Sequence, residues 1–157
     1  MQTKKYVYTL LLTSFVLIAG GMIFCPVPPA AAHGTGSDHV HAENQGGIDT
    51  ADLWLEMVDS GRYQAAWQTA SGMFRSRISR EDWAKAVSGV REPLGDLVQR
   101  KLFHHRATRT MPGAPDGAYL VLRYKTAFVH KAAAVETVTL VQTPKDGSWR
   151  VVGYFVK

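Results

Sequence analysis

The spacing of apolar residues changes once along this chain, near Gly95, and this change limits the folds it can adopt. Before Gly95, apolar residues recur every three or four positions, the spacing of a helix with one buried face. After Gly95 they alternate with polar residues, the spacing of a strand with one buried face. We therefore expect an α+β domain in which all the helices precede all the strands.

Three helices are predicted before Gly95. The first starts near Ile48 and stops at Gly61, and the second ends near Gly72. Ser79 stands three residues before Asp82, a pattern that caps the start of a third helix, which Pro93 and Gly95 close. The apolar stripes are Ala51, Trp54, Leu55 and Val58; Tyr63, Ala66, Trp67 and Ala70; and Trp83, Val87 and Val90. Trp54, Trp67 and Trp83 are therefore expected in the core.

Four strands are predicted after Gly95, at residues 96–109, 118–129, 134–143 and 148–156. Each run is rich in β-branched and aromatic residues. The links between them are short, and Asp146-Gly147 is typical of a hairpin turn. Strands joined in this way pair with their sequence neighbours as an antiparallel meander. The expected architecture is three helices packed on one face of a curved four-stranded sheet.

Residues 1–32 resemble a secretory signal peptide. Lys4 and Lys5 precede an apolar run from residue 6 to 24, and Ala30 and Ala32 suit a cut before His33. This predicts an exported protein, periplasmic or extracellular. An uncleaved anchor formed by residues 6–24 is the alternative, because the run is nearly long enough to cross a bilayer. Residues 33–47 are then predicted to be a flexible leader, and residues 48–157 a single domain.

Removing this segment changes the charge balance. The whole chain has 18 Lys and Arg against 13 Asp and Glu, a net charge of +5. Residues 1–32 hold two lysines, no acidic residue and the single cysteine, so residues 33–157 carry about +3 and no thiol. The remaining basic residues are scattered among acidic ones, which argues against nucleic acid as a partner. No phosphate-binding loop, zinc-protease helix or nucleophile elbow is present, and no cofactor is expected.

Several segments together resemble domain-of-unknown-function family 4019. They are REPLG at 91–95, PGAPDGAYLVL at 112–122, AVETVTLV at 134–141 and DGSWRVVGYFVK at 146–157, with Trp54, GRYQAAW and Trp83 before them. The resemblance covers about residues 52–157. It implies an exported bacterial protein with the cone-shaped fold of the nuclear transport factor 2 superfamily. That superfamily includes isomerases, dehydratases and non-catalytic binding modules, so the resemblance leaves the function open.

The candidate site lies on the sheet face that the helices should cover. If the first hairpin pairs Thr110 with Gly117, Lys101 lies opposite Thr126, and the next hairpin places Thr126 beside Glu136. The predicted ligand-facing residues are Lys101, Phe103, Tyr124, Thr126 and Glu136, together with Arg91 from the third helix. Glu136 is the candidate general base and Tyr124 a candidate hydrogen-bond donor. The alternative is that Glu136 forms a structural ion pair with Lys101 or Arg91.

The histidines offer a weaker candidate. His104 and His105 are adjacent in a strand and point to opposite faces, so they cannot share one metal ion. His33, His39 and His41 in the leader could bind copper or zinc weakly, the alternative being a solvated spacer. No metal site is predicted firmly.

These observations favour a non-catalytic domain that binds a small ligand or an envelope protein in or beside the concavity between helices and sheet. The first alternative is an isomerase-like or dehydratase-like enzyme using Glu136. The second is weak metal binding through the leader. The superfamily resemblance also implies a possible homodimer through the outer sheet face, where Val121, Arg123 and Lys125 are expected.

Overall fold

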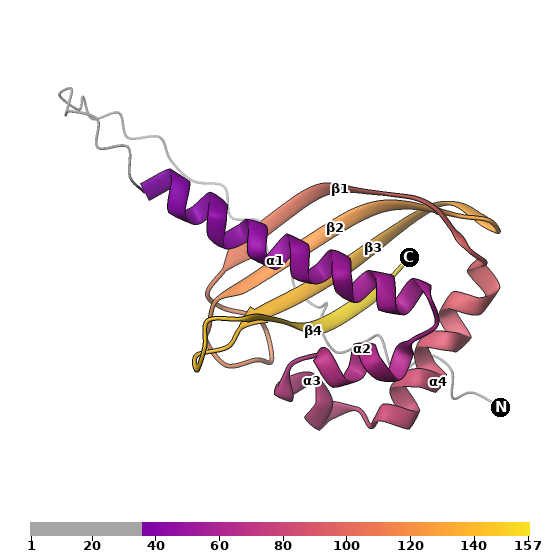
Figure 1. Ribbon diagram of the computed structural model, residues 1–157, viewed down its shortest axis with the longest axis horizontal. Helices are drawn as coiled ribbons and strands as arrows, with labels where there is room; N and C mark the ends of the chain where they lie inside the picture. The colour runs from indigo at the N-terminus through magenta and orange to yellow at the C-terminus, as the bar shows by residue number, and fades with distance from the viewer. Residues whose placement is uncertain (1–35) are drawn as a thin grey trace, which may run out of the picture.

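A computed structural model describes residues 36–157, with side chains from residue 44 onward. Four helices precede four strands (Figure 1). The helices are α1 (Gly36–Asp59), α2 (Tyr63–Thr69), α3 (Gly72–Arg77) and α4 (Arg80–Arg91), followed by a short 3-10 turn, η1 (Glu92–Leu94). The strands are β1 (Leu97–Thr108), β2 (Tyr119–Phe128), β3 (Lys131–Gln142) and β4 (Trp149–Val156). The predicted α+β class is confirmed, with one helix more than expected.

The sheet is an antiparallel meander in the order β1-β2-β3-β4. Helix α1 lies across one face, and α2, α3 and α4 group beside it near β4 (Figure 1). The opposite face, which we call the outer face, has no helix over it in the described part of the chain. Within residues 36–157, no helix is both long and apolar enough to cross a membrane.

Three tryptophan side chains connect the helices to one another. Trp54 and Trp83 are buried and Trp67 packs against the same core, as predicted. Each indole nitrogen donates to a backbone carbonyl of another part of the helical layer: Trp54 to Ala66 at 2.8 Å, Trp67 to Ile78 at 2.9 Å, and Trp83 to Tyr63 at 3.0 Å. The three indole N–H groups are thus satisfied within the helical layer.

Helix α3 was not predicted. Its six residues are too few to show a helical period, and Gly72, expected to end α2, begins α3 instead. The Ser71 hydroxyl accepts a hydrogen bond from the Phe74 backbone N–H at 3.1 Å, which caps the new helix. By contrast, the predicted cap of α4 is confirmed, because the Ser79 hydroxyl accepts from the Asp82 N–H at 3.1 Å.

Helix α1 begins at Gly36, earlier than the expected domain start at Ile48. Residues 36–47 of the expected leader are therefore helical. Gly47 is buried, and a Cβ atom placed there would lie 2.5 Å from Leu120 Cδ2 and 3.4 Å from the Trp149 ring. Residues 36–47 approach the sheet closely at Gly47 because this residue has no side chain. A contact of this kind adds no apolar residue to the sequence, so the polar composition of the segment did not indicate it. The predicted signal peptide, residues 1–32, lies outside the described residues.

Candidate functional site

A bulge in β1 decides which of its side chains face the helices. From His104 to Thr108, β1 pairs with β2 in the predicted register, for example His105 with Leu122. Between Leu102 and His104 the register shifts by one residue. A one-residue shift reverses the face of every side chain beyond it. Arg100, not Lys101, therefore lies opposite Thr126 on the inner face.

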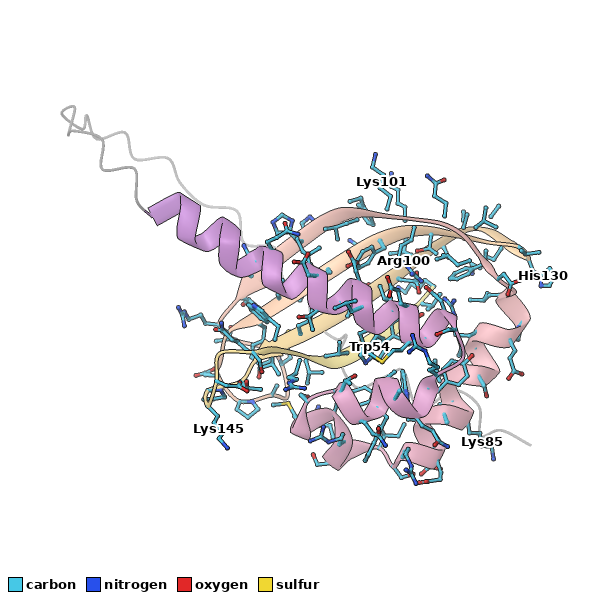
Figure 2. All side chains as sticks on the ribbon, in the orientation of Figure 1. Trp54, Lys85, Arg100, Lys101, His130 and Lys145 are labelled. Atoms are coloured by element: carbon cyan, nitrogen blue, oxygen red, sulfur yellow. The ribbon has the colours of Figure 1, made fainter. Side chains whose placement is uncertain are left out.

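The predicted positions of Lys101 and Phe103 are consequently wrong. Lys101 is exposed and pairs with Lys125 across the outer face, and Phe103 is 41% exposed. Figure 2 shows Lys101 pointing away from the helices, whereas Arg100 lies between the sheet and α1. The sequence of β1 contains no Gly or Pro that would have indicated a bulge.

The β2–β3 pairing also differs from the expected one, by two residues. Tyr124, not Thr126, lies opposite Glu136. Because side chains alternate with a period of two, this shift keeps Glu136 on the inner face. The inner placement of Tyr124, Thr126 and Glu136 is thus as predicted, although their partners are different.

Glu136 is completely buried, with 0% of its surface exposed, and its carboxylate accepts five hydrogen bonds. Oε1 accepts from Arg91 Nη1 at 3.2 Å, Arg100 Nη2 at 3.1 Å and the Tyr154 hydroxyl at 2.6 Å. Oε2 accepts from Arg100 Nε at 2.6 Å and the Thr126 hydroxyl at 2.7 Å. Both oxygens are therefore fully engaged by protein donors.

Asp59, the last residue of α1, completes the cluster. Its Oδ1 accepts from Arg91 Nη2 at 2.6 Å and Arg100 Nη2 at 2.9 Å, and its Oδ2 accepts from Arg100 Nη1 at 2.6 Å. The two arginines and two carboxylates balance in charge, and their side chains are at most 17% exposed. We call Asp59, Arg91, Arg100 and Glu136 the ionic cluster. It ties α1 and α4 to β1 and β3.

Burial and hydrogen bonding shift the pKa values of Arg100 and of two tyrosines near the cluster. Burial opposes the charge of Arg100, but hydrogen bonds to Asp59 and Glu136 outweigh this and raise its pKa. Burial and then the negative charge of Glu136 raise the pKa of Tyr154. Tyr124 donates to Asp52 Oδ1 at 2.8 Å, and burial followed by this hydrogen bond raises its pKa. Both tyrosines therefore stay neutral at ordinary pH.

This arrangement is built to hold charge in place. A general base needs a free lone pair directed at a substrate proton, and both Glu136 oxygens already accept from protein donors. Two hollows on the described surface, of about 540 Å³ and 430 Å³, are lined by neither Glu136 nor Tyr124. In the part of the chain that the structure describes, no buried side-chain nitrogen or oxygen lacks a hydrogen-bond partner.

Of the six predicted site residues, Arg91 and Glu136 belong to the ionic cluster, and Thr126 donates a hydrogen bond to Glu136. Tyr124 lies beside it and bonds to α1 instead. Sequence reasoning missed Asp59, Arg100 and Tyr154. Asp59 continues the helical spacing of the apolar stripe of α1, four residues after Leu55. Tyr154 lies two residues before Val156 in β4, so the two side chains share one face of the strand. Periodicity could therefore have indicated both residues. Arg100 left none, because the bulge reverses its face.

The histidine candidates gain no support. His104 and His105 are both exposed on β1. Among the described residues, no group of three or more metal-ligating side chains comes together. His33 and the side chains of His39 and His41 lie outside the described part, so weak metal binding by the leader stays a prediction.

The family resemblance is borne out by a direct comparison. A family model described as "Protein of unknown function (DUF4019)" matches residues 50–154, about two thirds of the chain. The chain belongs to the DUF4019 family. The match spans β1, β2, β3 and most of β4 and includes every member of the ionic cluster, so the cluster lies within the DUF4019 domain. No curated protein and no solved structure matches the chain significantly. Likeness to the nuclear transport factor 2 fold remains a prediction.

Proposed function

We propose that this chain is an exported, non-catalytic binding domain that engages its partner through the outer face of the sheet. The observation that carries the proposal is the saturated state of Glu136: the polar groups between helices and sheet bind one another. Export rests on the features of residues 1–32. The partner is a small ligand or an envelope protein.

The outer face has the properties that the interior lacks. Arg123 and Lys125 are exposed there, and both cations lie over the Phe103 ring, 5.3 Å and 5.5 Å from its centroid. Exposed aromatic and cationic side chains are typical of binding surfaces. A hollow of about 540 Å³ also opens on this side, within the usual size range of ligand sites.

A homodimer through this face has less support. A two-fold axis brings the same patch of each subunit together. Arg123 and Lys125 of both subunits would then lie in one interface, with no carboxylate on the strands of this face to neutralise them. No observation on the described residues favours the isomerase-like alternative, since Glu136 is shielded from solvent.

Native mass spectrometry of the purified protein tests the proposal. Arg123→Glu reverses a charge on the outer face, and Lys85→Glu is the matched control, because Lys85 is exposed on α4 (Figure 2). We expect the wild type and the Lys85→Glu variant to retain the same molecule and the Arg123→Glu variant to lose it. Retention by the Arg123→Glu variant, or no retained molecule in any of the three proteins, would contradict the proposal.

A further inference from the structure

Acidic residues are nearly absent from the sheet of this domain. In the four described strands, β1 to β4, Glu136 is the one acidic residue, and it is buried against the helices. Exposed carboxylates lie in the helical layer instead, for example Asp52 and Glu56 of α1. The outer face of the sheet therefore carries basic side chains with no acidic strand residue beside them.

Three lysines on this face border the 540 Å³ hollow. Lys101 and Lys125 face each other directly across β1 and β2. Val135 follows in the same row on β3, and it exchanges backbone hydrogen bonds of 3.0 Å and 3.1 Å with Lys157, just beyond β4. All three lysines line the hollow, together with Gln99 and the small side chains Ala132 and Ala133. We call this site the lysine hollow.

The arrangement has an electrostatic cost in the free protein. Like charges directly opposite each other on neighbouring strands destabilise a sheet. None of the three lysines forms a salt bridge with any residue from 44 to 157. Aromatic rings contact two of these lysines: Lys125 lies over Phe103, and the Lys157 Nζ atom lies 5.6 Å from the Phe155 ring centroid. A bound anion would remove this cost.

The chemistry of the hollow selects the type of anion. Lysine binds phosphate as a compact point charge, and three lysines together favour an anion with more than one negative charge. The lining holds lysines and no arginine. The alanine side chains leave room for a compact group. The volume of the hollow is in the range of small-molecule sites.

We propose that the lysine hollow binds a small soluble molecule through its phosphate group. This inference rests on the proposed function, whose binding face it shares, and it names the chemistry of the ligand. The three ammonium groups neutralise the phosphate oxygens, and Gln99 adds a neutral donor at the rim. Because the site is open to solvent, binding weakens as ionic strength rises.

Isothermal titration calorimetry with inorganic pyrophosphate tests the proposal. We expect saturable 1:1 binding to the wild type, and about tenfold weaker binding for Lys101→Gln and for Lys125→Gln, because each removes one nearby charge. Lys85→Gln, on the exposed side of α4, should bind like the wild type. All the substituted side chains are exposed, and unchanged thermal unfolding shows that the variants are folded.

Three outcomes would overturn the proposal. One is no binding of pyrophosphate at millimolar concentration. Another is equal affinity in the wild type and the Lys101→Gln/Lys125→Gln double variant. The third is a protein that binds phosphatidylglycerol vesicles more strongly than phosphatidylcholine vesicles but does not bind pyrophosphate. The phosphate group would then belong to a lipid and not to a soluble molecule. If the Arg123→Glu variant loses the molecule that the wild type retains in native mass spectrometry, but the wild type does not bind pyrophosphate, the phosphate assignment is refuted. The proposal that the outer face binds a partner then still stands.

Discussion

Replacing Glu136 by glutamine should destabilise the fold strongly without changing its shape. The substitution is isosteric but removes one of the two negative charges of the ionic cluster. Arg91 and Arg100 would then share Asp59 alone, leaving a net charge of +1 among side chains that are at most 17% exposed. The amide nitrogen of glutamine would also face donors where a carboxylate oxygen now accepts.

The magnitude follows from the burial of the cluster. Removing one partner of a buried ion pair costs about 3–5 kcal/mol, since the other charge is left without compensation. A domain of this size has a free energy of unfolding of about 5–15 kcal/mol. The variant should therefore lose a large share of its stability, and its Tm should fall by at least about 12 °C.

Urea unfolding followed by tryptophan fluorescence measures this change, because Trp54 and Trp83 are buried in the native state. Glu56→Gln is the matched control: the side chain is exposed on the same helix as Asp59, and its loss should cost under about 0.5 kcal/mol. A Glu136→Gln cost below about 1 kcal/mol would refute the reasoning.

A double variant separates loss of charge balance from loss of packing. Glu136→Gln with Arg100→Gln leaves Asp59 paired with Arg91, so the cluster is neutral again. We expect the double variant to lose less stability than the sum of the two single variants, by about 1–3 kcal/mol. Strict additivity would show that the charges act independently, and the four side chains would then not form one coupled cluster.

Three smaller predictions concern other parts of the fold, each measured as a change in the free energy of unfolding. Gly47→Ala should destabilise by about 1–3 kcal/mol, because the added Cβ meets Leu120 at 2.5 Å, whereas Gly46→Ala, with 3.8 Å of clearance, should be neutral or stabilising; the same sign for both would contradict the packing. Burial and a carboxylate partner raise the pKa of Tyr124 above its usual 10, so stability is lost as pH rises past 10, where the unfolded chain ionises first. Tyr124→Phe should flatten that loss by up to about 1.4 kcal/mol per pH unit, and an unchanged slope would count against it. Ser79→Ala should cost about 1 kcal/mol through the lost cap of α4, and no cost would show that the cap is dispensable.

The fold class was predictable because it depends on periodicity, which many residues share. A stripe such as Ala51, Leu55 and Val58 carries the same information several times, so one misplaced boundary does little harm. The start of α1 at Gly36 was not predictable for the opposite reason. Gly47 contributes to packing by having no side chain, and absence of a side chain leaves no apolar signal.

The site was harder to predict because it depends on register, which single residues decide. A shift of two residues between β2 and β3 left Glu136 facing inward, so its inner placement was predicted correctly from the wrong pairing. A shift of one residue in β1 exchanged Arg100 for Lys101. Periodicity cannot detect such a bulge, because β1 has charged or polar side chains on both of its faces.

The same bulge links the buried cluster to the outer hollow. Without it, Lys101 would face the helices and Arg100 would face solvent. An ammonium group offers three donors from one point, whereas the guanidinium of Arg100 spans both carboxylates and donates to Glu136 and Asp59 at once. The bulge thus places the planar guanidinium of Arg100 between the two carboxylates of the cluster. It places the ammonium group of Lys101 on the solvent-exposed face, beside Lys125. The bulge between Leu102 and His104 therefore both completes the buried cluster and places Lys101 beside Lys125 on the outer face.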